Sequence, residues 1–167
     1  FRLHFDFAFM KGLLAFAFIV GLSLPADAQR IIDVDDSIDE CNFMPYELTY
    51  YIDSSNTVSF EEVSSEAFRK RFQQHSSYQN KDFKINASYW IRVPIRHSSR
   101  TQKVWLLEFY DQTIDSLDAF VPQSDGSYRK IQMGDRLPFG SRSLLHKNFE
   151  ILLDMKSDTV MVYYFRV

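Results

Sequence analysis

The chain is poor in the residues on which many active sites and small folds depend. Its 167 residues include one cysteine and four histidines. Cys41 cannot form an internal disulfide, so the hydrophobic core has to stabilise the fold. After residue 28 the histidines are His75, His97 and His146, and no pair of them has the spacing of zinc ligands. The sequence therefore predicts neither a metal site nor a cofactor.

Recognisable catalytic motifs are also missing. The sequence has no Gly-x-Ser-x-Gly nucleophile elbow, and no histidine lies near Cys41 in the sequence. Asp115 and Asp118 come closest to a carboxylate pair, but their odd separation directs them to opposite faces of a strand. We therefore predict that this segment is not an enzyme.

Neither sign of charge dominates the chain. Lysine and arginine number 19, aspartate and glutamate number 22, and the formal net charge is −3. A mildly acidic chain has no electrostatic reason to bind nucleic acid or an anionic membrane surface. Nucleic acids are therefore excluded from the expected partners.

The N-terminal apolar run is shorter than the roughly 20 residues that a membrane-spanning helix needs. Lys11 precedes an uncharged stretch at Gly12–Leu24, and Ala26-Asp27-Ala28 follows as a small-x-small cleavage site. This order is typical of a secretory signal peptide, here starting at Met10. We assign residues 1–28 to upstream residues and a signal peptide. The alternative is an uncleaved anchor.

Cleavage after residue 28 would leave 167 − 28 = 139 residues, which is enough for one domain. Residues 29–44 are acidic, with no basic residue after Arg30 and no glycine for a calcium loop, and we expect a flexible solvated leader. Residues 45–167 form the expected domain. It ends on an apolar strand pattern without a polar tail, so we expect the natural protein to continue beyond it.

Alternating hydrophobicity predicts a β-rich body. In Ser88–Arg96, the residues Tyr89, Ile91 and Val93 fall on one face, and the intervening residues fall on the other. A helix is predicted from Ser64 or Ser65 to Gln74. Further strands are predicted at Glu47–Ile52, Lys103–Tyr110, Ile114–Val121, Tyr128–Met133, Asn148–Asp154 and Thr159–Val167. Short strands without alternating helices indicate an all-β fold, a jelly-roll-like β-sandwich with one short helix.

Planar polar side chains gather in the long segment that follows Gly134. It exceeds the usual hairpin loop of about 2–5 residues, and long loops on rigid sheets often carry binding residues. A sugar ring stacks on an aromatic side chain while its hydroxyls bond to arginine, amide and carboxylate groups. The candidate ligand-binding residues are Trp90, Arg92, Glu108, Asp135, Arg136, Arg142, His146 and Asn148.

A structural interpretation of the same residues is open. Trp90 and Trp105 are then core aromatics, and Arg92 and Arg136 pair with internal carboxylates. Such pairs would fix the loop to the sheet and bind no ligand.

Three motifs in order carry a family resemblance. They are Tyr-Trp-Ile-Arg at residues 89–92, Trp-Leu-Leu-Glu at residues 105–108, and Gly-Asp-x-x-Pro-Phe…Arg…His-x-Asn-Phe at residues 134–149. Over residues 45–167 the chain resembles the extracellular domain type 2 of bacterial seven-transmembrane receptors with diverse intracellular signalling modules (7TMR-DISM). Lys147 replaces a more usual arginine, and residues 84–87 lack a glycine often present in the family.

The resemblance implies a jelly-roll sensor domain that binds a carbohydrate or a similar small molecule. It also implies a place on the periplasmic or extracellular face of the bacterial inner membrane, with membrane segments and a signalling module beyond residue 167. A second copy of the chain, forming a homodimer, is a further partner that we leave open. The alternatives are a structural or protein-interaction β-sandwich module and a secreted carbohydrate-binding module.

The signal-peptide pattern gives a direct prediction. After expression and export in a bacterial host, N-terminal sequencing of the product should begin at Gln29, because the small-x-small site ends at Ala28. Retention of Gly12–Leu24 in the mature protein would show that the run is an anchor.

Overall fold

The computed structural model describes residues 30–42, 47–74, 83–101, 104–153 and 158–167. The predicted signal peptide lies outside these residues. No helix in the described part is long and apolar enough to cross a membrane. Residues 31–167 form one compact unit, which contains all of the described strands.

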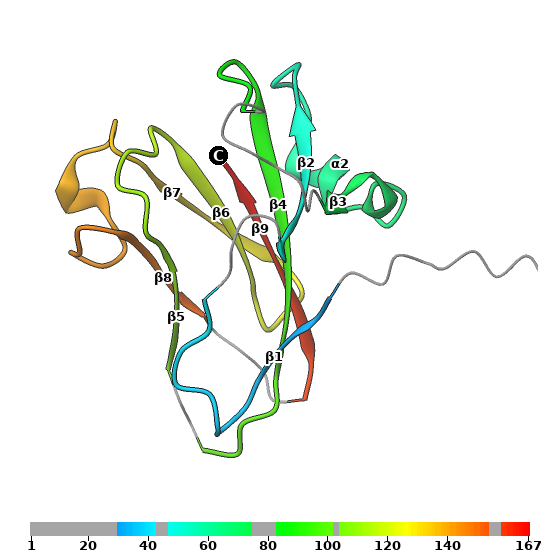
Figure 1. Cartoon of the computed structure of the whole chain (residues 1–167), viewed down its shortest axis with the longest axis vertical. Coiled ribbons are helices and arrows are strands. Elements are labelled where there is room, and N and C mark those ends of the chain that lie inside the picture. Colours follow the sequence, from blue (N-terminus) through cyan, green and yellow to red (C-terminus); the bar gives the residue numbers. More distant parts are fainter. Residues whose placement is uncertain (1–29, 43–46, 75–82, 102–103, 154–157) are drawn as a thin grey trace, which may run out of the picture. The chain divides into compact units, whose positions relative to one another are not determined.

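Two sheets make up this unit (Figure 1). The larger has the strand order β3-β2-β4-β9-β6-β7, with β1 alongside β4. The smaller pairs β5 with β8. Apart from the parallel β1–β4 pair, all pairings are antiparallel. The strands are β1 (Ile32–Val34), β2 (Thr49–Asp53), β3 (Gln73–Gln74), β4 (Ser88–His97), β5 (Trp105–Phe109), β6 (Leu117–Pro122), β7 (Tyr128–Met133), β8 (Phe149–Leu153) and β9 (Val160–Arg166). The predicted all-β sandwich is confirmed.

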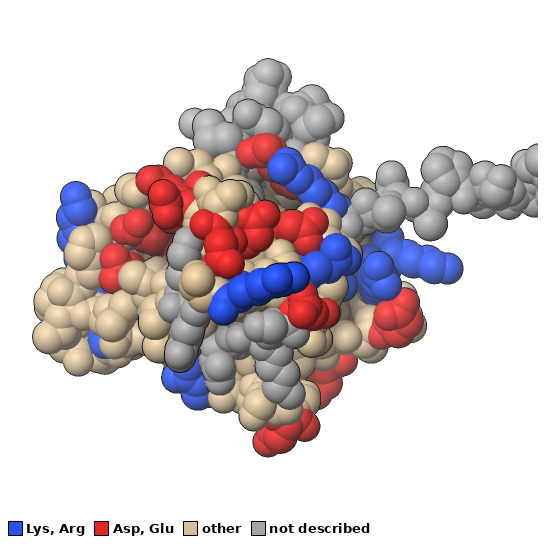
Figure 2. Space-filling model, turned by 90° about the horizontal axis from the view of Figure 1, so that it is seen from below, with Lys and Arg blue, Asp and Glu red and all other residues tan. Residues whose placement is uncertain are grey.

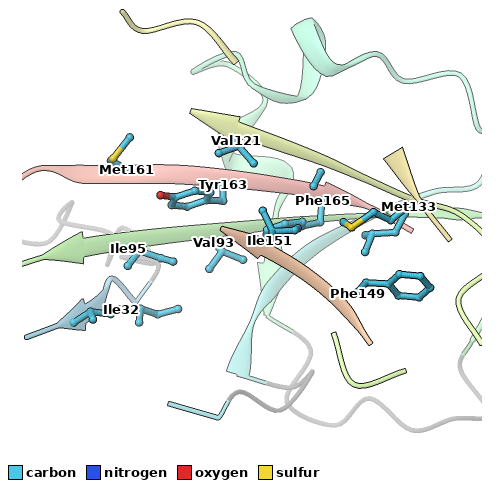
Figure 3. Packing of buried hydrophobic residues seen from close by; sticks show 13 residues of the cluster. Ile32, Val93, Ile95, Val121, Met133, Phe149, Ile151, Met161, Tyr163 and Phe165 are labelled. Atoms are coloured by element: carbon cyan, nitrogen blue, oxygen red, sulfur yellow. The ribbon is translucent and has the colours of Figure 1, made fainter. Parts of the chain in front are cut away.

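The main core lies between the two sheets. Alternate residues of β4, β6 and β9 point toward β5 and β8, as the period-2 pattern requires. Figure 3 shows Val93, Tyr163 and Phe165 from the larger sheet near Ile151 from the smaller one. Burial of these apolar side chains holds the small sheet, which as an isolated pair of strands would be marginally stable.

A second, aromatic core covers the opposite face of the larger sheet. Trp90, Phe120 and Tyr164 point to this side and pack beneath the segment that follows β2. The ring of Phe60 stacks on Phe120 with centroids 4.1 Å apart and an interplanar angle of 2°. Central strands of the larger sheet are therefore buried on both faces, and the even-numbered side chains of β4 do not form an open surface.

The predicted helix is misplaced. Helix α2 spans Phe60–Val63, and a 3-10 turn, η2, spans Arg69–Arg71. Ser59 caps α2, because its hydroxyl accepts a hydrogen bond from the backbone N–H of Glu62 at 3.2 Å. The predicted end of the helix, at Gln74, belongs instead to β3, which pairs with β2. Capping at Ser59 and strand pairing at Gln73–Gln74 thus replace one continuous helix with two short turns.

The acidic leader is more ordered than expected. Ile32 and Val34 are buried, and their strand β1 pairs in parallel with β4. Asp36 then accepts hydrogen bonds from Ser99, Arg100 and Thr101. The side-chain hydrogen bonds from Ser99 and Thr101 hold the pKa of Asp36 far below its usual range. An Ile-x-Val alternation of three residues among acidic neighbours is too short to predict a strand.

The packing of β8 predicts that two adjacent residues, Ile151 and Leu152, contribute very differently to stability. Ile151→Ala should lower the free energy of unfolding by about 2–5 kcal/mol, because it removes a side chain buried between the sheets. Leu152→Ala is the matched control, because Leu152 is 49% exposed, and it should change stability by less than about 0.5 kcal/mol. Urea unfolding followed by circular dichroism measures both. Equal losses at the two positions would contradict the assigned faces of β8.

Candidate functional site

The small sheet presents two carboxylates on its outer face. Phe149 and Ile151 are fully buried in the main core, so Glu150 between them points away from it. Glu108 lies directly opposite Glu150 in the β5–β8 register. Like charges directly opposite one another destabilise a strand pair. The sheet therefore needs a positive or hydrogen-bonding group between these two side chains.

The loop between β7 and β8 starts from a constrained glycine. Gly134 has a φ of +143°, and a side chain there would overlap the backbone carbonyl of Asp115. The next residues continue this contact, because the N–H of Asp135 donates to the carbonyl of Ile114 at 2.8 Å. Arg136 Nη2 also lies 2.7 Å from Asp115 Oδ2. The first half of the loop is thus fixed to the turn that precedes β6, and its glycine is required by close backbone approach.

Arg142 orders the second half of the loop. Its guanidinium lies 4.8 Å from the ring centroid of Phe139 and 4.6 Å from that of Phe149. Its Nη1 donates to the backbone carbonyls of His146 and Lys147 at 2.7 and 2.5 Å. A planar cation that stacks and donates at the same time is what arginine provides and lysine does not. Arg142 thereby fixes the backbone from which His146 projects.

His146 reaches the two outward carboxylates. Its Nδ1 lies 2.9 Å from Oε1 of Glu150 and 3.6 Å from Oε1 of Glu108. Asn148 Nδ2 donates to the same Glu108 oxygen at 2.6 Å. One donor atom from each of His146, Glu108 and Glu150 lies within 4.8 Å of the others, and all three residues are half-buried. We refer to these three residues as the Glu-His-Glu cluster.

The hydrogen bonds at His146 cannot all form in one protonation state. The N–H of Asn148 points at Nδ1 from 3.3 Å, which requires a lone pair there. The 2.9 Å approach to Glu150 requires a proton on Nδ1 if it is a hydrogen bond. The contact with Glu150 is the shorter of the two, at a distance typical of charge-assisted bonds.

The surroundings of the cluster are negative. The charges of Glu108 and then Glu40 raise the pKa of Tyr110 above its usual range. Tyr110 is 70% exposed, and Phe139 on the adjoining loop is 53% exposed. Figure 2 shows a largely uncharged area at its left-hand end, where the loop before β8 lies, and mixed charges elsewhere on the view. Exposed aromatic rings and a negative polar cluster thus occupy the same end of the small sheet.

The structure divides the eight candidate residues into groups. Glu108, His146 and Asn148 meet directly, with Arg142 behind them. Asp135 and Arg136 lie at the other end of the loop, next to the turn before β6. Trp90 and Arg92 face the aromatic core on the opposite side of the larger sheet, where Trp90 is 1% exposed. Trp90 therefore lies in the structure as a core aromatic residue.

Glu150 is a member of the cluster that the sequence did not predict. Its position in β8 opposite Glu108 follows from strand register, which the sequence alone does not give. The sequence contained a weak indication of Glu150, because His146, Asn148 and Glu150 lie at every second position. Such positions share one face wherever the chain is extended.

A comparison with protein families identifies the chain. The model of the family 7TMR-DISM extracellular 2 matches residues 46–167. The chain therefore belongs to this family, the type 2 extracellular domains of seven-transmembrane receptors with diverse intracellular signalling modules. The resemblance predicted from the three motifs is confirmed. Neither the curated proteins nor the solved structures contain a match.

The geometry of the loop predicts that substitution of Gly134 lowers stability and that substitution of Gly140 does not. Gly134→Ala should reduce the free energy of unfolding by about 1–3 kcal/mol or more, because an L-residue is strained at this φ and its Cβ meets the Asp115 carbonyl. Gly140→Ala is the control, because a Cβ at Gly140 meets nothing within 4 Å, and its effect should stay within about 0.5 kcal/mol. Chemical denaturation measures both changes. A neutral Gly134→Ala would show that the loop can leave the turn before β6 without cost.

Proposed function

We propose that the domain is the ligand-sensing module of a bacterial membrane receptor and that it binds a carbohydrate or a similar small polar solute. The observation that carries this proposal is the outer face of β5 and β8. There Glu108, His146 and Asn148 converge; the exposed ring of Tyr110 lies by Glu108, and that of Phe139 packs on Arg142 of the same loop. The family membership supports an extracellular position for this face, on the periplasmic side of the inner membrane.

The chemistry of this face suits a polyhydroxylated ligand. Carboxylates accept hydrogen bonds from hydroxyl groups, and an imidazole can donate or accept. Exposed aromatic rings offer flat apolar surfaces for the C–H face of a sugar. Tyr110 and Phe139 take over the stacking role that the sequence assigned to Trp90, whose indole is enclosed in the aromatic core.

Sensing accounts for this face better than hydrolysis. The carboxyl groups of glycosidases are separated by roughly 5–5.5 Å or 6.5–9.5 Å, so that the scissile bond lies between them. Here the imidazole of His146 contacts both carboxylates, at 3.6 Å from Glu108 and 2.9 Å from Glu150, where a scissile bond would have to lie. We propose binding without catalysis within this segment.

The packing offers a route from this face to the membrane. The ring of Phe109 in β5 meets that of Phe165 in β9 edge to face, with centroids 5.1 Å apart. Strand β9 is the last strand that the structure describes. Under the proposal, membrane segments follow beyond residue 167, and a solute that reorients β5 biases the strand that leads to them.

The binding face can be tested by thermal shift against a library of glycans and small polar solutes, in buffer with chelator and no added metal. A solute at about 100 times its dissociation constant should stabilise the folded chain by about 2.7 kcal/mol. Glu108→Gln and Tyr110→Ala should reduce this shift, because they remove a hydroxyl acceptor and a stacking ring. Arg136→Ala is the control and should retain it, because its exposed side chain lies at the far end of the loop.

A solute whose binding depends on Arg136 and ignores Glu108 would move the site to the other half of the loop. If no solute stabilises the chain, the exposed Leu106 and Leu152 on the same face favour a protein contact instead. Light scattering would then show a homodimer that Leu152→Glu dissociates.

A further inference from the structure

The outer face of the small sheet holds more acceptors than its donors can satisfy. Glu108 and Glu150 are direct cross-strand partners, and the Nδ1 of His146 points at both. One proton on Nδ1 can serve one carboxylate fully, at 2.9 Å from Glu150, and leaves Glu108 at 3.6 Å, beyond good hydrogen-bond distance. A divalent cation would interact with all three atoms at once.

A second, independent sign comes from Asn148. The residue is 2% exposed, and its Oδ1 has no hydrogen-bond partner among the described residues. Its Nδ2 lies at Glu108, 2.6 Å from Oε1. Its Oδ1 is therefore a buried acceptor next to the cluster that no described donor satisfies.

From these contacts we infer that Glu108, His146 and Glu150 bind a divalent transition-metal cation of the zinc class. Zinc accepts imidazole nitrogen and carboxylate oxygen at about 2.0–2.2 Å in tetrahedral geometry, so neighbouring donor atoms lie about 3.4 Å apart. The observed separations of 2.9 and 3.6 Å from His146 Nδ1 lie on either side of that value. The two carboxylate oxygens lie within 4.8 Å of each other, and side-chain rotation would have to bring them to the same separation.

The kind of ligand distinguishes zinc from calcium and magnesium. Calcium takes 6–8 oxygen ligands, and magnesium prefers oxygen in an octahedral arrangement. A site with one imidazole and two carboxylates suits zinc and its neighbours in the transition series. The half-buried side chains leave the solvent side open, so the fourth position would hold water or an oxygen of a solute.

The surrounding contacts place the ligands before any metal arrives. Arg142 fixes the carbonyls of His146 and Lys147, and the sheet register fixes the two glutamates. Asn148 bonds to one of the carboxylates, which is the second-shell arrangement that metal sites use to orient their ligands. The metal would fasten the end of the loop to the small sheet. This inference does not depend on the proposed solute, and a failed solute screen leaves it standing.

Isothermal titration calorimetry of the purified, chelator-treated chain with ZnCl2 tests the site, with CaCl2 and MgCl2 in parallel. Zinc should bind at a stoichiometry of one, and calcium and magnesium should bind far more weakly. His146→Ala, Glu108→Gln and Glu150→Gln should each weaken zinc binding at least about tenfold, since even outer-shell changes commonly cost 10–100-fold. Glu66→Gln is the control, because its side chain is 87% exposed and remote in sequence from the cluster.

Circular dichroism and the metal-free melting temperature verify that each variant folds. The two glutamine variants should still fold, because each relieves the repulsion of two facing charges while weakening one contact to the loop. Failure of the parent chain to bind zinc would overturn the inference. Unchanged zinc affinity in His146→Ala and Glu150→Gln would overturn it as well, because the metal would then sit elsewhere.

Discussion

Strand β4 is the element on which the rest of the domain depends. It pairs with β1, β2 and β9, so that three neighbours take their register from it. Its odd-numbered residues Val93 and Ile95 enter the core shared with the small sheet, and Trp90 enters the aromatic core on the other side. A shift of one residue in this strand would exchange the two sets of side chains. Both cores, and through them the position of β5 and β8, therefore depend on the alternation of side chains along β4.

Most of the strands could be predicted because they are long enough for alternation to be visible. The pattern at Ser88–Arg96 needed no knowledge of its neighbours, whereas Ile32–Val34 alternates over only three residues and is recognisable as a strand only beside β4. The helix was misplaced for a related reason. Ser65 resembles a cap as closely as Ser59 does, and only the pairing of Gln73 with Tyr50 decides where helical structure must end. Local patterns predict elements, but tertiary pairing sets their limits.

The candidate site was predictable in part. The loop stood out through its density of planar polar groups, and Glu108, His146 and Asn148 from that prediction do meet. The partner strand of Glu108 could not be read from the sequence, so Glu150 was missed. Spacing rules for metal ligands search for residues close together along the chain, whereas Glu108 and Glu150 become neighbours across a strand pair. Trp90 shows the converse, since a sequence cannot tell which face of a strand a separate segment will cover.

The parallel strand β1 has a consequence for where the functional unit begins. The family match starts at residue 46, but Ile32 and Val34 fill part of the main core, and Asp36 holds the turn at Ser99. A protein trimmed to the family boundary would lose this strand and open one edge of β4 to water or to a second chain. His97, whose ring nitrogens have no hydrogen-bond partner among the described residues, lies on that edge. Residues that precede the family match are therefore part of the fold, and the folded unit is longer than its family signature.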